Sequence, residues 1–83
     1  MRIDDYLSTV GIVKRRTVAK ELGKNGLLAV NGHTVKPAHQ VKIGDIIRIK
    51  GSRPQAIEVI ALTSGSVSKD KRSEYFKRID TNM

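Results

Sequence analysis

The sequence predicts a small α+β domain in which two N-terminal helices pack on a small, mostly antiparallel sheet. Three observations predict this fold. Apolar residues recur at helical spacing over residues 2–25, short β-rich segments follow from residue 27, and an Asn-Gly pair separates the first two of these. With 83 residues, the chain has room for one compact domain.

The first helix is expected over residues 2–10. Its apolar residues follow at steps of three and four, and therefore share one face. They are Ile3, Tyr6, Leu7 and Val10. Two aspartates fall in the first turn, where the helix dipole favours negative charge, and Gly11 should end the helix.

The second helix is expected over residues 14–25, with Gly26 just beyond its last turn. Val18, Ala19 and Leu22 supply its apolar face. A second face carries a basic stripe, in which cations recur every fourth residue. The stripe consists of Arg16, Lys20 and Lys24.

The second half of the chain predicts strands and turns. Asn31-Gly32 favours a type I′ turn between two hairpin arms, because both positions tolerate positive φ. Gly44-Asp45 predicts another turn. The expected strands cover residues 27–30, 33–36, 46–49 and 57–62, with a loop at 51–56.

The last twenty or so residues predict a tail that follows a domain spanning residues 1–62. Residues 63–68 have linker composition, and residues 69–80 predict a short terminal helix. Tyr75, Phe76 and Ile79 would share one face of it. We expect this face to pack on the domain's own sheet, although it could instead dock a protein partner.

The charge balance points to a polyanionic partner. Sixteen Lys and Arg residues oppose eight Asp and Glu residues, which gives a net charge of +8. Nucleic acid is preferred over an anionic membrane surface or a simple solubility effect. There are no cysteines, no apolar run of membrane-spanning length and no signal peptide, so we expect a cytoplasmic protein. The sequence leaves the oligomeric state open, and we favour a monomer.

The basic residues of the N-terminal half are the candidate RNA-binding site, because cations along one helix face can follow the phosphates of a strand. The candidates are Arg2, Lys14, Arg15, Arg16, Lys20, Lys24 and Lys36. A solvated helix face is the alternative interpretation. We prefer RNA binding because Glu21 is the only acid between Lys14 and Lys24. The Asn31-Gly32 turn is interpreted as structural.

Catalytic and metal-binding patterns are missing from the sequence. Asp4 and Asp5 are adjacent and point in different directions, and Asp45 sits in a turn. His33 and His39 have no apparent third ligand for a metal ion. We therefore expect no enzyme activity, no cofactor and no metal.

The residues also resemble a known family, the S-four or alpha-L RNA-binding domain. The resemblance covers residues 1–62 and rests on Arg2-Ile3-Asp4, on Arg16-Thr17-x-Ala19-x-x-Leu22, on Gly26-x-x-x-Val30-Asn31-Gly32 and on Val41-x-x-Gly44-Asp45. It implies two helices against a bent antiparallel sheet. It also implies an RNA surface on the helix pair and its junction with the hairpin, with Arg2, Arg16 and Lys20 in contact with RNA.

Within this family the run from Ile12 to Glu21 is similar to stand-alone bacterial members of the heat-shock protein fifteen type and of the ribosome-associated quality control protein P type. The tail residues 75–79 look more like the second type. This resemblance implies binding to large-subunit ribosomal RNA and to a stranded peptidyl-tRNA, and support for non-templated tailing of the stalled chain. The alternatives are a generic structured-RNA or protein-tethering module in ribosome assembly, and a DNA-binding or membrane-surface protein.

The sequence departs from the family pattern at three positions. Asp5 stands where a basic residue is usual, Gly11 stands near a usual arginine, and Gly23 replaces a large apolar residue. A glycine inside a helix lowers its stability by ~1 kcal/mol relative to alanine.

Overall fold

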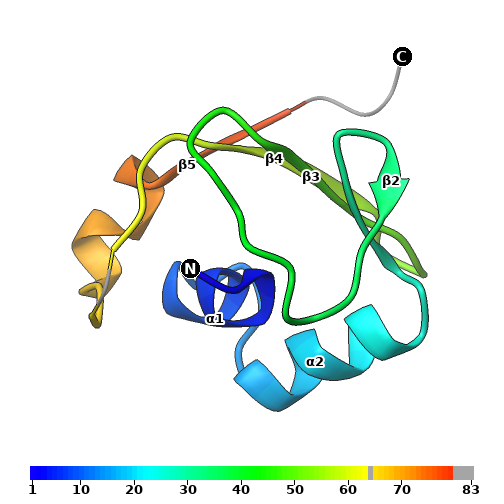
Figure 1. Ribbon diagram of the computed structural model, residues 1–83. Coiled ribbons are helices and arrows are strands. Elements are labelled where there is room, and N and C mark those ends of the chain that lie inside the picture. The colour runs from blue at the N-terminus through cyan, green and yellow to red at the C-terminus, as the bar shows by residue number, and fades with distance from the viewer. Residues whose placement is uncertain (64, 80–83) are drawn as a thin grey trace.

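The computed structural model describes residues 1–63 and 65–79. Two helices, α1 (Ile3–Thr9) and α2 (Arg16–Lys24), lie on the same face of one antiparallel sheet (Figure 1). The strands are β1 (Leu28–Val30), β2 (His33–Thr34), β3 (Ile46–Ile49), β4 (Gln55–Val59) and β5 (Phe76–Arg78), and a 3-10 helix, η1 (Lys69–Glu74), precedes the last. Their order in the sheet is β2-β1-β3-β4-β5. The predicted α+β fold is confirmed.

The β1–β2 hairpin turns at Asn31-Gly32, as predicted. Both residues have positive φ angles, of 52° and 87°, which is the requirement of a type I′ turn. Val30 pairs with His33 directly across the turn. On its other side β1 pairs with β3, so the hairpin forms one edge of the sheet.

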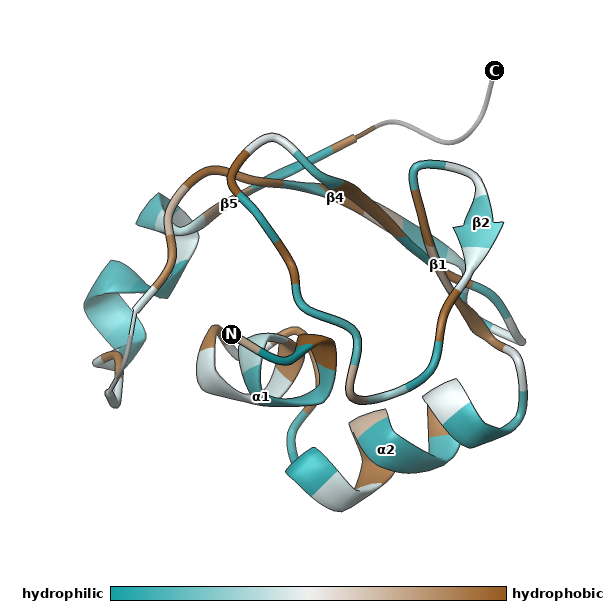
Figure 2. Ribbon diagram, in the orientation of Figure 1, coloured by the Kyte–Doolittle hydropathy of each residue, from teal (hydrophilic) through white to brown (hydrophobic). Residues whose placement is uncertain are grey.

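The core lies between α1 and the sheet. Ile3, Tyr6, Leu7 and Val10 are at most 1% exposed, which confirms the predicted apolar face of α1. They pack against inward-facing residues of the three central strands. These are Leu28, Val30, Ile47, Ile49, Ile57 and Val59. Figure 2 shows hydrophobic segments in β1, in β4 and in α1.

The second helix is shorter and less buried than predicted. It begins at Arg16, so that Lys14 and Arg15 lie in the segment before it. Of its predicted apolar face, Ala19 is buried and Leu22 is half-buried, but Val18 is 47% exposed. The helix lies at the edge of the molecule, against α1 (Figure 1), and its buried residues are Ala19 and Gly23.

The fourth strand begins and ends earlier than the predicted span of residues 57–62. Its register is fixed by pairing with β3, where Ile46 lies opposite Glu58 and Ile49 lies opposite Gln55. The chain leaves the ladder after Val59, and Ile60 is exposed. The loop is therefore shorter than the expected 51–56, because pairing with β3 makes β4 begin at Gln55.

The predicted terminal helix over residues 69–80 is wrong for residues 69–79, and residue 80 lies outside the described residues. Residues Lys69–Glu74 form a 3-10 helix, and Phe76–Arg78 form a strand that pairs with β4. The free edge of β4 satisfies the backbone groups of this segment, which overrides its helical spacing. Tyr75 and Phe76 nevertheless pack against the core, as expected.

Candidate nucleic-acid interface

The basic stripe runs along the outer side of α2. Arg16 opens the helix, Lys20 and Lys24 follow one and two turns later, and all three are exposed. Lys14 and Arg15 extend the row beyond the start of the helix and are exposed as well. Arg15 has an extended backbone, with φ −130° and ψ 142°. The predicted stripe is therefore present, although its first two residues are not helical.

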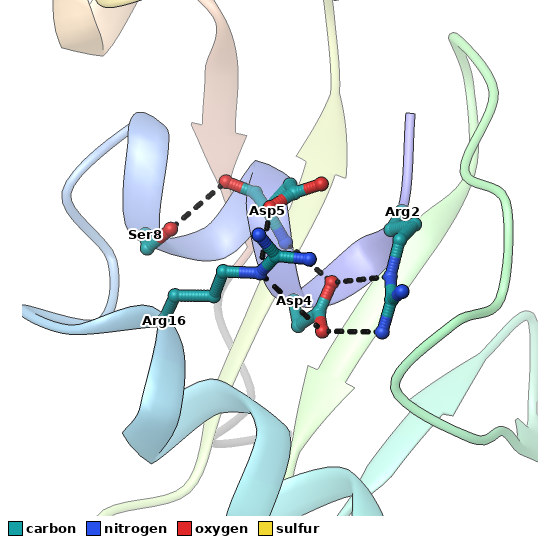
Figure 3. A network of polar contacts seen from close by, with 5 residues as sticks. All are labelled: Arg2, Asp4, Asp5, Ser8 and Arg16. Atoms are coloured by element: carbon teal, nitrogen blue, oxygen red, sulfur yellow. Dashed lines mark hydrogen bonds and ion pairs between the residues drawn. The ribbon is translucent and has the colours of Figure 1, made fainter.

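Two arginines of the candidate site meet a buried aspartate (Figure 3). Arg2 donates to both carboxylate oxygens of Asp4, from Nε at 3.1 Å and from Nη2 at 2.9 Å. The Nε atom of Arg16 lies 2.9 Å from Asp5 Oδ1 and 3.8 Å from Asp4 Oδ2. Asp4 is completely buried, so its charge depends on these partners for compensation.

This network fixes the two arginines and reduces their net charge. The side chain of Arg16 is still 55% exposed and that of Arg2 is 37% exposed, so both present guanidinium edges to solvent. Two aspartates oppose these two arginines, and the local charge is nearly balanced. Their contribution is therefore oriented hydrogen bonding more than long-range attraction.

The long-range field comes from the other cations. Within residues 1–63 and 65–79, Arg2 and Arg16 alone of the sixteen Lys and Arg residues form an ion pair with a described carboxylate. The exposed candidates without such a pair are Lys14, Arg15, Lys20, Lys24 and Lys36. Glu21 is the only acid of α2, and no described carboxylate lies within ion-pair distance of these cations, so they present net positive charge to an approaching polyanion.

The segment after β2 joins the N-terminus to the end of α2. The ring of Pro37 packs against Gly23, and the carbonyl oxygen of Pro37 accepts a hydrogen bond from the Asp4 amide at 3.3 Å. The Ile3 amide donates to the carbonyl of His39 at 2.8 Å. Lys36 is exposed and precedes this proline, so it lies next to the C-terminal end of the basic stripe.

The side chain of Asn31 serves the fold. Its Oδ1 accepts from the Ile46 amide at 3.0 Å, and its Nδ2 donates to Asp45 Oδ1 at 3.2 Å. The other carboxylate oxygen of Asp45 accepts from the Lys42 amide. These bonds tie the hairpin turn to the turn before β3, in agreement with the structural interpretation of Asn31.

Sequence reasoning missed the part that Asp4 and Asp5 play. Both were interpreted as charges at the start of a helix, whereas the structure uses them to hold Arg2 and Arg16. The pattern Arg2-x-Asp4 is the available signal, since its two side chains pair directly. The ion pair between Asp5 of α1 and Arg16 of α2 depends on how the two helices pack, so the local sequence does not predict it.

Two other features concern metals and membranes. In the part of the chain that the structure describes, no three His, Asp or Glu side chains gather as a metal site would require, and His33 and His39 are both exposed. None of the described helices is long and apolar enough to cross a bilayer.

The family model of the S4 domain matches residues 1–47, which include both helices, the hairpin and the Arg2–Asp4–Arg16 network. The chain belongs to the S4 domain family. The match confirms the resemblance seen in the sequence. The sheet extends past the match, because β4, β5 and the second half of β3 lie beyond the matched residues.

Relatives and solved structures extend this assignment over most of the chain. The S4 protein is 38% identical over 76 residues to the RQC P-site tRNA stabilizing factor of Listeria innocua, covering 92% of this chain and 83% of that protein. A protein of the same name from Streptococcus pneumoniae is 34% identical over 76 residues, covering 90% and 86%. The trimeric structure of Vibrio cholerae Heat Shock Protein 15 superposes with a TM-score of 0.86 at 21% identity, covering 95% and 81%, and shares the fold.

Proposed function

We propose that this protein binds RNA of the large ribosomal subunit, together with a P-site peptidyl-tRNA, in the rescue or quality control of stalled translation. It acts in the cytoplasm as a monomer that binds and does not catalyse, and it supports tailing of the stalled nascent chain. The observation that carries the proposal is the row of exposed cations along α2, in which Lys20 and Lys24 form no ion pair with a described carboxylate and Arg16 is held by Asp5. The names of the relatives supply the ribosomal context.

The geometry of the row suits an RNA strand. Cations on successive turns of α2 can each neutralise one phosphate, and the counterions they release drive binding. The predicted contacts divide into two kinds. Lys14, Arg15, Lys20, Lys24 and Lys36 attract the backbone through their charge. Arg2 and Arg16, held by Asp4 and Asp5, offer fixed donors that favour one orientation of the phosphate.

Binding to isolated large subunits tests the proposal with a matched pair of variants. Lys20→Gln removes a cation from the stripe, and Lys77→Gln removes a lysine that is also exposed but lies on β5, at the far edge of the sheet. We expect Lys20→Gln to weaken co-sedimentation with subunits several-fold, and Lys77→Gln to leave it unchanged. Equal binding by the two variants and the wild type would remove the stripe as the RNA surface.

A second comparison tests the tRNA part of the proposal. Large subunits with and without a P-site peptidyl-tRNA are titrated with the wild-type protein at one fixed salt concentration, because affinities at different salt cannot be compared. We expect tighter binding to the subunit that carries tRNA. Equal affinity for both would leave a ribosomal RNA-binding module, of the kind that an assembly factor needs, without a tRNA contact.

A further inference from the structure

A basic hollow of about 330 Å³ opens beside the start of α2. Three segments far apart in the sequence line it: the end of α1, the start of α2 with the residue pair before it, and the chain from residue 66 to η1. The lining residues are Ser8, Thr9, Lys14, Arg16, Ser66, Val67 and Arg72. Three cationic residues and three hydroxyl-bearing residues thus line one space, together with a single aliphatic residue.

Arg72 brings a cation from the C-terminal part of the chain to this place. It lies on η1, which runs beside α1 (Figure 1). Its side chain occupies the space that a side chain at Gly11 would need, because a β-carbon there would stand 2.9 Å from Cδ and 3.0 Å from Nη1 of Arg72. Gly11 also has φ +80°, so glycine suits this close approach in both respects.

The Nε atom of Arg72 is buried and finds no hydrogen-bond partner among the described residues. An unpaired buried donor costs free energy, and a charged donor costs more than a neutral one. The arginine is therefore held half-buried at the rim of the hollow without an acid to balance it. A purely structural arginine would be expected to pair with a carboxylate or a carbonyl group.

The charges around the hollow do not cancel. Asp5 pairs with Arg16 from the side of α1. Lys14 and Arg72 form no ion pair with a described carboxylate, and the acids of η1, Asp70 and Glu74, are exposed and do not line the hollow. The site therefore keeps about two net positive charges, which is more than enough to attract the single negative charge of a backbone phosphate.

We propose that this hollow binds one phosphate group of the RNA backbone, with Arg72 as the residue that completes it. The proposal rests on the proposed function, since it assigns a place on the protein to one phosphate of the bound RNA. Guanidinium groups of Arg16 and Arg72 supply directed donors, Lys14 supplies a point charge, and the hydroxyls of Thr9 and Ser66 can donate to the remaining oxygens, while the Ser8 hydroxyl donates to the Asp5 carbonyl. The C-terminal segment is then part of the RNA surface.

Arg72→Gln tests the site, with Lys69→Gln as the matched control. Lys69 is an exposed cation of the same 3-10 helix that does not line the hollow. Affinity for large-subunit RNA is measured over a series of salt concentrations. We expect Arg72→Gln to weaken binding about tenfold. The magnitude of the slope of log affinity against log salt should fall by about one, which is the change expected when one phosphate contact is lost. Lys69→Gln should change neither.

Two further variants separate binding from folding. Arg72 packs on Gly11, so Arg72→Gln is also expected to lower thermal stability, but a smaller folded fraction does not change the salt slope. Arg72→Lys keeps the charge and should keep the slope. If Arg72→Gln keeps the wild-type affinity and salt slope while Lys20→Gln weakens binding, the hollow is not a phosphate site, and the proposed function stands. If the wild type does not bind the RNA, both fall.

Inorganic phosphate distinguishes an RNA phosphate from a free one. Amide resonances of Ser66 and Arg16 are followed while phosphate is added to the wild type and to Arg72→Gln. Weak, Arg72-dependent shifts that RNA abolishes by competition support the proposal. Arg72-dependent shifts that persist at saturating RNA would show that the hollow holds a separate anion, and would overturn the assignment to the RNA backbone.

Discussion

Gly23 of α2 lies so close to Pro37 that a β-carbon at position 23 would stand 2.6 Å from Cγ and 2.8 Å from Cδ of the proline ring. This contact explains a glycine in the interior of a helix, where alanine is otherwise better by ~1 kcal/mol. The same contact holds the segment after β2 against the helices and places Lys36 beside the end of the basic stripe. The glycine is therefore needed for close packing with Pro37, and this packing outweighs its lower helix propensity.

Gly23→Ala is expected to destabilise the protein. The alanine restores ~1 kcal/mol of helix propensity, but overpacking costs ~1–3 kcal/mol, so the free energy of unfolding should fall by ~1 kcal/mol. Urea denaturation measures the change. In a Pro37→Ala background the crowding atoms Cγ and Cδ are absent and only the backbone nitrogen, at 3.0 Å, remains close, so the same substitution should be less destabilising than in the wild type. A stabilising Gly23→Ala in the wild-type background would show that the packing is loose.

Arg2→Ala and Arg16→Ala are expected to differ in their effect on stability. Arg2 makes two hydrogen bonds to the buried carboxylate of Asp4, and its loss leaves that charge poorly compensated, which should cost ~2 kcal/mol. Arg16 pairs mainly with the half-buried Asp5 and is itself more than half exposed, so its loss should cost less than ~1 kcal/mol.

Thermal and urea unfolding of the two variants test this order. The order of destabilisation matters for RNA-binding experiments, because a loss of affinity can be assigned to a lost RNA contact only when the variant stays folded. Arg16→Ala should therefore be the cleaner probe of the interface, while Arg2→Ala mixes folding and binding. If Arg16→Ala proves the more destabilising of the two, the 3.8 Å approach of Arg16 to Asp4 contributes more than its length indicates.

Local patterns predicted the parts of the fold that local forces determine. The apolar face of α1 and the Asn31-Gly32 turn follow from side-chain spacing and from backbone conformation, and both were predicted correctly. The basic stripe could be predicted as well, since exposed cations at a spacing of four need only a helix. The predicted start of α2 was two residues too early, because no capping side chain marks the true start at Arg16.

The parts that failed depend on partners distant in the sequence. The span 69–80 has a helical spacing of apolar residues, yet Phe76–Arg78 becomes a strand because the edge of β4 is available. The same holds for the candidate site. Asp4 becomes a buried partner of Arg2 only when α1 packs under the segment after β2, and Arg72 reaches the start of α2 only through the position of η1.

Removal of residues 69–83 is expected to damage the fold and not only the tail. The carbonyl oxygen of Tyr75 accepts hydrogen bonds from the Tyr6 hydroxyl at 2.6 Å and from the amides of Ile60 and Ala61 at 2.9 and 3.1 Å. The deletion also strips β5 from β4. Together these losses should cost ~3 kcal/mol or more, since a buried hydroxyl and strand amides lose their partners.

Circular dichroism and amide hydrogen exchange measure that loss. The truncated chain should unfold at a lower temperature, and exchange should be faster throughout β4. A truncated protein with wild-type stability would mean that the last strand is an independent appendage. In that case, a loss of RNA binding on truncation could be assigned directly to contacts made by the tail.

Tyr6 should make stability fall at high pH. Burial raises the pKa of Tyr6 to about 12 from its ordinary value of 10.0. Below pH 10 the hydroxyl is protonated in both folded and unfolded chains, and the folded state keeps its full stability. Between pH 10 and 12 the unfolded chain releases the proton and the folded chain does not, so the free energy of unfolding falls, by ~2.7 kcal/mol in all.

Tyr6→Phe isolates this effect from the titration of the many lysines, which the variant shares with the wild type. At pH 8 the variant should be less stable by ~1 kcal/mol, because it lacks the hydrogen bond to Tyr75. From pH 10 upward the wild type should lose stability faster than the variant. When the free energies of unfolding from urea denaturation are plotted against pH, the two curves should therefore converge and then cross. Parallel curves from pH 8 to 12 would mean that the hydroxyl ionises as readily in the folded chain as in the unfolded one, which its burial should prevent.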